Sequence, residues 1–305
     1  MTAMQQTTKA YLMIAVGASF WGLIGLFVAP LHGYGFTSLQ VVALRAVSAA
    51  FLLLLYTAIR KPALLKVAPV DLWYFIGTGV ISIVFFNWAF FATIDRSSLS
   101  IAVVLLYTGP TFVTVLSYFI FKEPLTKRKI SALVSTIIGC ALVTGAFPGG
   151  EWAIPLNSLF IGLASGFFFG LYSIFGKAAS RRYSSLTIST YTFIFAGVAV
   201  VPFSGLSQKM DLLFNAGVWL NTLGLSLVST VLAYFLYTLG LSWVESSRAS
   251  ILATLEPVVA TLIGLLVFGD MLTIWQGLGV ILVVSAVILV AEHSKKVVNQ
   301  EIRKT

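Results

Sequence analysis

Apolar residues gather in ten runs, separated by short connections that carry most of the charged residues and several turn-forming Pro and Gly. Each run has about 18–26 residues, the length a helix needs to cross a hydrocarbon layer of about 30 Å. None alternates strictly between apolar and polar residues, as strands of a membrane barrel do. The pattern predicts an all-α membrane protein with ten transmembrane helices, expected at 10–30, 39–59, 72–94, 99–121, 130–147, 157–178, 186–203, 217–243, 249–269 and 273–291.

The second half of the chain resembles the first at a nearly constant offset. With a shift of 147 residues, Ala102–Thr126 aligns without a gap with Ala249–Thr273, and Glu123 falls on Asp270. Fixed-period similarity of this kind indicates duplication of a structural unit. The predicted units are five-helix repeats at 10–147 and 157–291, flanked by tails at 1–9 and 292–305.

The basic residues predict the orientation of the helices. With the N-terminus inside, 16 of the 19 Lys and Arg residues fall on the inner side. Arg96 and Lys209 fall outside, and Arg45 lies within a helix. This excess indicates a cell-membrane protein with both termini in the cytoplasm. The net charge of +9 is therefore a membrane signature, and we expect no nucleic-acid partner.

An odd number of helices per unit has a geometric consequence. The second unit must start on the opposite side of the membrane, so the two units form inverted repeats. This arrangement recurs in secondary transporters, whose substrate site lies at the membrane midplane between the repeats and alternates in its access.

Composition and rare residues exclude other chemistry. The chain is 59% hydrophobic and only 10% charged, which is typical of membrane proteins rather than soluble domains. Its two His residues, His32 and His293, lie outside the runs, and Cys140 is its single cysteine. We therefore expect no metal site, no cofactor and no enzymatic activity. A P-loop is also missing, so transport energy must come from a gradient.

Two ionisable side chains within the predicted helices are the first functional candidates, because charge in the hydrocarbon layer is costly. Glu256 lies about 12 Å from the inner end of its helix, and Arg45 about 12 Å from the outer end of another. The two residues are thus expected at similar depth. They form either a solute- or proton-binding pair or a structural ion pair, and the sequence leaves both readings open.

Prolines occur at matching positions in the fourth and ninth helices, Pro110 and Pro257. A proline inside a helix removes one backbone hydrogen bond and introduces a kink. Interrupted helices at corresponding places in two repeats point to a transporter site. Polar and aromatic residues at compatible depths complete the candidate solute path: Trp21, Asn87, Tyr107, Tyr172, Tyr234 and Tyr237.

These features together resemble the EamA family of the drug/metabolite transporter superfamily. The resemblance rests on the two five-helix halves, Trp21-Gly22 in the first helix, Arg45 in the second, and Glu256-Pro257 in the ninth. It implies an inner-membrane secondary transporter, often an exporter of amino acids or related metabolites. The implied partners are a small-molecule solute and the lipid bilayer. Gly109 replaces a carboxylate in the first repeat, so a symmetric charge mechanism is not expected.

Alternatives remain at this level. A polytopic sensor or assembly partner that transports nothing would share the composition, and an intramembrane enzyme is disfavoured by the missing residues. Proton coupling, direction of transport, solute identity and the formation of a homodimer are left open.

Overall fold

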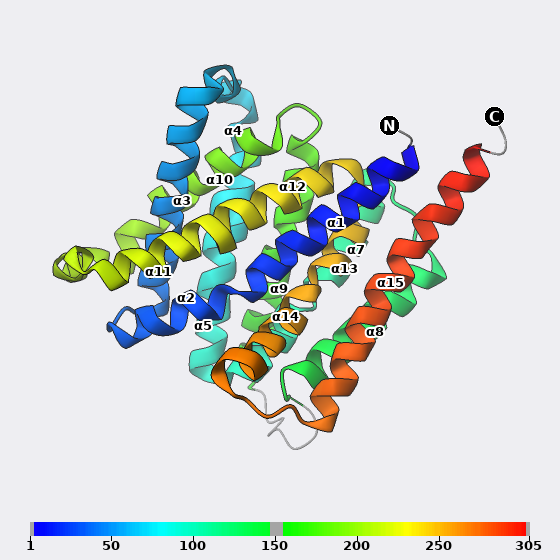
Figure 1. Cartoon of the computed structure of the whole chain (residues 1–305). Coiled ribbons are helices and arrows are strands. Elements are labelled where there is room, and N and C mark those ends of the chain that lie inside the picture. The colour runs from blue at the N-terminus through cyan, green and yellow to red at the C-terminus, as the bar shows by residue number, and fades with distance from the viewer. Residues whose placement is uncertain (1–2, 147–154, 303–305) are drawn as a thin grey trace.

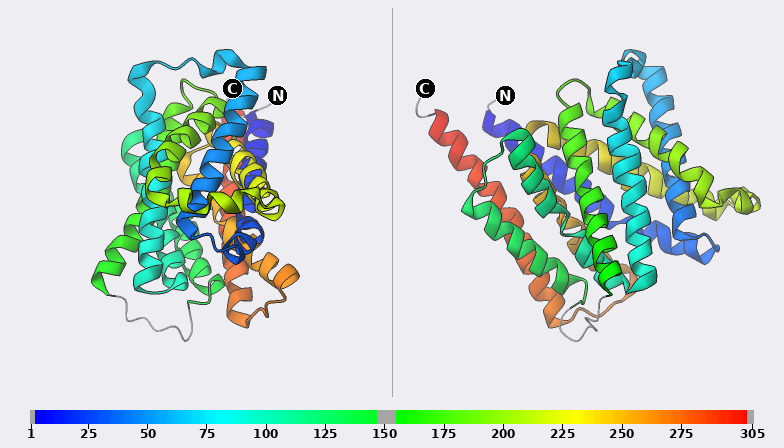
Figure 2. Two further views of the ribbon diagram at one scale, coloured as in Figure 1. Left: turned by 90° about the vertical axis from the view of Figure 1, so that its left-hand side faces the viewer. Right: turned by 180° about the vertical axis from the view of Figure 1, so that it is seen from behind.

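The computed structural model describes residues 3–146 and 155–302. Every regular element in these ranges is helical, and the helices pack into one bundle (Figure 1). The end of the first predicted repeat at residue 147, and residues 1–2 and 303–305 of the predicted tails, lie outside the described residues. Both ends of the chain lie at the same end of the bundle, here called the terminal face (Figure 2). The other end is called the opposite face.

The first half of the chain supplies eight α-helices and a π-helical segment. They are α1 (Ala3–Gly22), α2 (Ile24–Gly33), α3 (Ser38–Arg60), α4 (Leu72–Ile76), η3 (Gly77–Val84), α5 (Phe85–Arg96), α6 (Leu99–Leu106), α7 (Gly109–Phe121) and α8 (Lys127–Val143). Short 3₁₀ turns η1 (Pro62–Leu65) and η2 (Pro69–Asp71) connect α3 to α4.

The second half has a similar order of elements. They are α9 (Leu156–Ala179), α10 (Ser185–Ser204), the 3₁₀ segment η4 (Leu206–Phe214), α11 (Ala216–Ser226), η5 (Leu227–Leu232), α12 (Ala233–Trp243), α13 (Ser246–Ala253), α14 (Leu255–Ile263), η6 (Gly264–Phe268) and α15 (Ile274–Ile302).

Nine helical stretches of the described residues are long and apolar enough to cross a membrane. They correspond to nine of the ten predicted runs. The fifth run is the helix α8, whose 17 residues give about 26 Å of rise, slightly less than the hydrocarbon layer. The all-α membrane class is therefore confirmed, and the count of ten stays a prediction.

Large apolar side chains cover the outside of the bundle. Phe51, Phe160 and Phe203 are 63%, 67% and 80% exposed, respectively. A soluble protein rarely exposes so much contiguous apolar surface. In lipid these side chains are solvated, and the backbone polar groups are satisfied within the helices.

Several predicted helices are interrupted near their middle. The first is broken at Leu23, between α1 and α2, although no proline lies there. The fourth is divided at Tyr107–Thr108 and the ninth at Thr254. The π-helical segments of the third and eighth begin at Gly77 and Leu227, 150 positions apart, so these irregularities occur at matching places in both halves.

The repetition extends to single hydrogen bonds. Thr114 Oγ1 donates to the Pro110 carbonyl at 2.8 Å, and Thr261 Oγ1 donates to the Pro257 carbonyl at 2.9 Å. Both prolines lie within the first three residues of a helix. Because the first amides of a helix have no intrahelical acceptor, a proline there costs no hydrogen bond.

α8 and α15 form a pair at one edge of the bundle (Figures 1 and 2). A Cβ atom on Gly139 would lie 3.0 Å from the Gly279 carbonyl oxygen, and one on Gly279 would lie 2.7 Å from that of Gly139. Two glycines thus let these helices approach closely, as small residues do in membrane bundles. The remaining helices surround the centre of the molecule.

Candidate functional site

A cavity of about 590 Å³ occupies the centre of the bundle. Six of the eight predicted solute-path side chains line it: Trp21, Arg45, Asn87, Tyr107, Tyr234 and Glu256. They come from α1, α3, α5, the break between α6 and α7, α12 and α14. A neighbouring cavity of about 500 Å³ shares Trp21, Tyr107 and Glu256 with it and also touches Pro257. The volumes are those of small-molecule sites.

Arg45 and Glu256 are the Arg and Glu side chains in the lining of this cavity. Neither takes part in any of the ion pairs among the described residues, nor in a hydrogen bond between described residues that involves its side chain. Arg45 is only 8% exposed, and its Nε is a buried donor without a partner. The structural ion pair that the sequence left open is therefore not formed here. A carboxyl group and a guanidinium group thus line the same cavity, and neither makes a hydrogen bond or an ion pair with another described residue.

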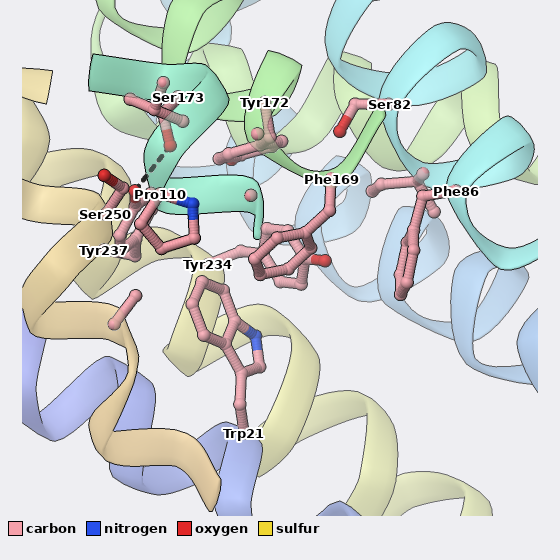
Figure 3. A pocket seen from close by; sticks show the side chains of 15 residues that line it. Trp21, Ser82, Phe86, Pro110, Phe169, Tyr172, Ser173, Tyr234, Tyr237 and Ser250 are labelled. Atoms are coloured by element: carbon pink, nitrogen blue, oxygen red, sulfur yellow. Dashed lines mark hydrogen bonds between the residues drawn. The ribbon is translucent and has the colours of Figure 1, made fainter. Parts of the chain in front are cut away.

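Trp21 provides a second buried donor. Its Nε1 has no partner among the described residues, and the side chain is 6% exposed. The indole packs edge-on against Tyr234, with ring centroids 4.9 Å apart, and lies 5.1 Å from the Tyr237 ring (Figure 3). Edge-to-face contacts of this kind fix the orientation of aromatic rings. The indole N–H is thus held in place at the cavity wall.

Gly22 brings α1 against α14 next to Glu256. A Cβ atom at position 22 would lie 2.8 Å from the Glu256 carbonyl oxygen and 2.6 Å from the Val259 Cβ. Such distances are too short for any side chain, so only glycine permits this approach. The Trp-Gly pair thus has two roles: the indole lines the cavity, and the glycine sets the position of the helix that carries Glu256.

The other predicted residues lie around this centre. Tyr172 and Tyr237 line a small deeper pocket together with Pro110 (Figure 3). Their hydroxyl groups join α9 to α12, through Thr238 at 2.7 Å and Ser173 at 2.6 Å. Both hydroxyl groups therefore form hydrogen bonds between these two helices, while the two side chains line the pocket.

Two further polar side chains lie at the large cavity. Asn87 Nδ2 donates to the Ile83 carbonyl at 2.7 Å and so supports the end of η3. His32, which the sequence placed in a loop, lines the cavity, and its Nδ1 lies 3.0 Å from the Phe36 carbonyl. The imidazole therefore lies on the side of the cavity nearer the opposite face.

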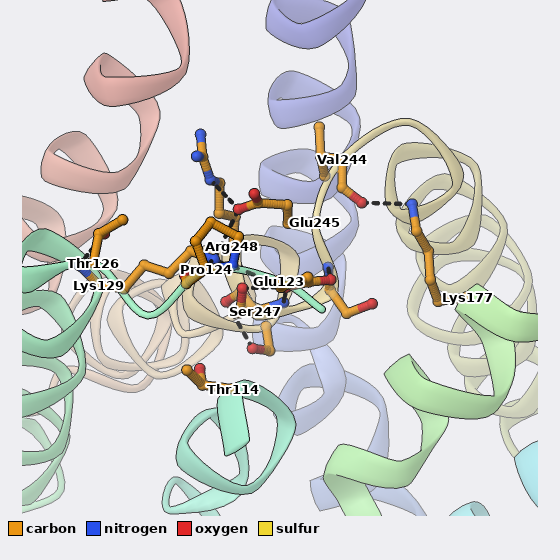
Figure 4. Close-up of polar contacts among 12 residues, drawn as sticks. Thr114, Glu123, Pro124, Thr126, Lys129, Lys177, Val244, Glu245, Ser247 and Arg248 are labelled. Carbon is orange, nitrogen blue, oxygen red and sulfur yellow. Dashed lines mark hydrogen bonds and ion pairs between the residues drawn. The ribbon is translucent and has the colours of Figure 1, made fainter. Parts of the chain in front are cut away.

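The cavity extends toward the opposite face. Its lining includes Ser38 and Leu99, the first residues of α3 and α6, and none of the connections at the terminal face. Those connections are held together by a cluster of charges (Figure 4). Lys129 Nζ lies 2.9 Å from Glu245 Oε2, and Arg248 Nε lies 2.5 Å from the same oxygen.

Lys177 adds to this cluster, which sequence reasoning did not identify. Its Nζ donates to the carbonyls of Leu241, Ser242 and Val244 at 2.9, 3.2 and 2.7 Å. A cation is favourable at the C-terminal end of a helix, here α12. The sequence comparison of the repeats aligned Glu123 with Asp270. It could not reveal the contacts of Lys129 with Glu245 or of Lys177 with Leu241, because these residues are far apart in the sequence.

The charge cluster should make stability depend on acid. Burial opposes the ionised form of Glu245, but Lys129 and Arg248 outweigh it and hold the pKa of Glu245 below its ordinary value of 4.5. A lowered pKa stabilises the folded state above the ordinary value, and this contribution is lost as pH falls through the folded-state pKa. The unfolding temperature of Glu245→Gln in detergent should therefore lie below that of the parent at pH 7, and the gap should narrow below about pH 4.5. A gap of equal size at pH 7 and in acid would contradict this role.

The comparison with known proteins now decides the family. The sequence matches the EamA-like transporter family over residues 8–145 and 156–291. The chain belongs to this family. It is a multi-pass membrane transporter built from two EamA repeats, and not an enzyme.

Relatives of this EamA-family chain carry transporter names. The uncharacterized inner membrane transporter YicL of Salmonella typhimurium is 23% identical, covering 96% of this chain and 98% of that protein. An uncharacterized transporter of Archaeoglobus fulgidus is 27% identical over 66% of this chain and 70% of its own length. One solved crystal structure shares the fold, with a TM-score of 0.77 and 16% identity over 95% of this chain and 99% of the other.

Proposed function

We propose that this chain is a gradient-driven secondary transporter that exports amino acids or related small compounds by alternating access. The observation that carries the proposal is the central cavity in which the unpaired Glu256 and Arg45 both lie. A zwitterionic solute could pair its ammonium group with Glu256 and its carboxylate with Arg45. Such a solute would satisfy both charges without a net change of charge in the membrane.

The donors and rings around the cavity support the same solute class. The Trp21 Nε1 and Arg45 Nε atoms are buried and unpartnered among the described residues, so they favour a ligand with acceptor oxygens. Trp21, Phe90, Tyr107 and Tyr234 supply aromatic surface to the same cavity. Ring faces attract ammonium groups and apolar side chains.

We further propose ten membrane crossings, with α8 as the fifth, arranged as inverted five-helix repeats at 10–147 and 157–291. The matching interruptions at Tyr107–Thr108 and Thr254 support the repeat. The strong bias of Lys and Arg toward one set of connections supports cytoplasmic termini in the inner membrane. In that orientation the terminal face is cytoplasmic, and the cavity extends toward the outside.

Reconstituted protein tests the solute class. Proteoliposomes should accumulate labelled neutral amino acids at least several-fold faster than vesicles without protein. Amines and carboxylic acids that carry only one of the two charges should move more slowly. Transport of single-charge solutes alone would contradict pairing with both Glu256 and Arg45. The same vesicles, with and without an imposed pH gradient, would show whether protons supply the driving force.

A further inference from the structure

Glu123 fastens the two halves of the molecule together at the terminal face. It follows α7, and its carboxylate accepts hydrogen bonds from the backbone amides of Ser246 at 2.6 Å and Ser247 at 3.1 Å (Figure 4). It also accepts one from the Ser247 hydroxyl. These amides are at the start of α13, whose own N-cap residue Glu245 makes no side-chain cap. A carboxylate from the first repeat thus caps a half-helix of the second, where both the free amides and the helix dipole favour it.

Asp270 occupies the corresponding place after α14. The Glu123 amide donates to the Ser117 carbonyl at 3.2 Å, and the Asp270 amide donates to the Gly264 carbonyl at 3.0 Å. Each acid follows a residue in the left-handed conformation. Both acids thus follow the same kind of turn, although α7 before Glu123 is α-helical and η6 before Asp270 is π-helical. The side chains differ, because Asp270 is exposed and its carboxylate makes no hydrogen bond or ion pair with another described residue.

The half-helix that corresponds to α13 is α6, and it begins beside the same cavity as Asp270. Leu99, Ser100 and Asp270 all line the cavity of about 500 Å³. At present α6 is capped by its own Ser98, which accepts from the Ile101 amide at 3.3 Å. Ser98 is the N-cap of α6 and corresponds to Glu245, the N-cap of α13, whose side chain makes no cap. In this structure Glu123 of the first repeat caps α13 of the second, whereas Asp270 of the second repeat does not cap α6 of the first.

We infer that Glu123 and Asp270 are alternating gate latches. Glu123 closes the terminal face by capping α13, and Asp270 closes the opposite face by capping the first turn of α6 when the terminal face opens. This inference rests on the alternating access proposed above. It adds two gating residues that do not line the central cavity of about 590 Å³, so neither is expected to touch a solute bound between Glu256 and Arg45.

The two latches differ in their ion-pair partners, and this difference explains why the terminal face is the closed one in this structure. Lys129 Nζ lies 3.9 Å from Glu123 Oε2 and also pairs with Glu245. Its counterpart in the second repeat is Gln276, which carries no charge. The Glu123 latch is thus reinforced by ion pairs that the Asp270 latch lacks. The free protein therefore rests with the terminal face closed.

Paired cysteine reporters test the latches in membrane vesicles. In a Cys140→Ala background, Ser250→Cys reports opening at the terminal face, and Val103→Cys, its repeat counterpart, reports opening at the opposite face. Glu123→Gln keeps the size of the side chain but removes its charge. It should raise the labelling rate at the Ser250→Cys reporter about fivefold or more and lower the rate at Val103→Cys. Asp270→Asn should have the reverse effect at both reporters.

Asp95→Asn, which alters another exposed acid near the opposite face, is the matched control and should change neither rate. Unchanged labelling in Glu123→Gln, or a response to Glu123→Gln without a reverse response to Asp270→Asn, would overturn the paired assignment. Solute transport is measured on the same proteins. Failure of the parent to transport any solute would count against the proposed function alone, because the reporters read the gates without solute.

Discussion

Glu256→Gln should lower the rate of solute transport in proteoliposomes about tenfold or more. The substitution preserves the size of the side chain but removes the charge that would pair with the solute ammonium group. A hydrogen bond to a charged group contributes about 1.5–3 kcal/mol, and 1.4 kcal/mol corresponds to a factor of ten. If Glu256 also carries a coupling proton, the variant should lose any response to an imposed pH gradient.

Asp95→Asn is the control for this experiment, because it removes an exposed carboxylate that does not line the cavity and should leave transport unchanged. Solute binding by calorimetry, compared between the two variants, distinguishes lost affinity from lost movement. Transport by Glu256→Gln at the parental rate, at every pH and solute concentration, would exclude Glu256 from both roles.

Gly22→Ala should destabilise the protein and impair transport, although it adds only a methyl group. That methyl group would overlap the Glu256 carbonyl and the Val259 side chain, so α14 would have to move away from α1. Overpacking of this kind costs about 1–3 kcal/mol. The shift would also displace Glu256 within the cavity. We expect a lower unfolding temperature in detergent together with slower transport.

Gly25→Ala is a close match for comparison. It lies one turn away on α2, and a Cβ atom there would have no neighbour within 4 Å. Alanine should therefore be tolerated at Gly25 and, by its higher helix propensity, even slightly stabilising. Because Gly25 also lines the cavity, the matched readout is the unfolding temperature. An equal loss for the two substitutions would show that the approach of α1 to α14 is not what Gly22 provides.

The helical class was predictable from the sequence, because membrane-spanning helices are recognised by the length and the hydropathy of their apolar runs. Local interruptions were less predictable. Pro110 and Pro257 marked two of them, but the break at Leu23 has no proline beside it, and the π-helical turns beginning at Gly77 and Leu227 have no sequence signal. These features depend on how each helix packs against its neighbours.

For the candidate residues, depth in the membrane was predictable from the sequence, but side-chain contacts were not. Depth along a helix placed Glu256 and Arg45 at a similar level, because a helix rises by a constant distance per residue. Whether their side chains meet, face a cavity or pair with other groups depends on the rotation of helices from different repeats. Tyr172 and Tyr237, which met the same depth criterion as Tyr234, have hydroxyl groups engaged between α9 and α12.

The amino-acid sequence by itself determined the apolar helices, the duplicated unit and the charge bias of the connections, since each depends only on the order of residues along the chain and not on their contacts in space. Only the tertiary structure decided which side chains share the central cavity, and that Glu123 caps α13 while Asp270 has no partner among the described residues. Those outcomes depend on contacts between residues more than a hundred positions apart, whose geometry is set by the packing of all the helices at once.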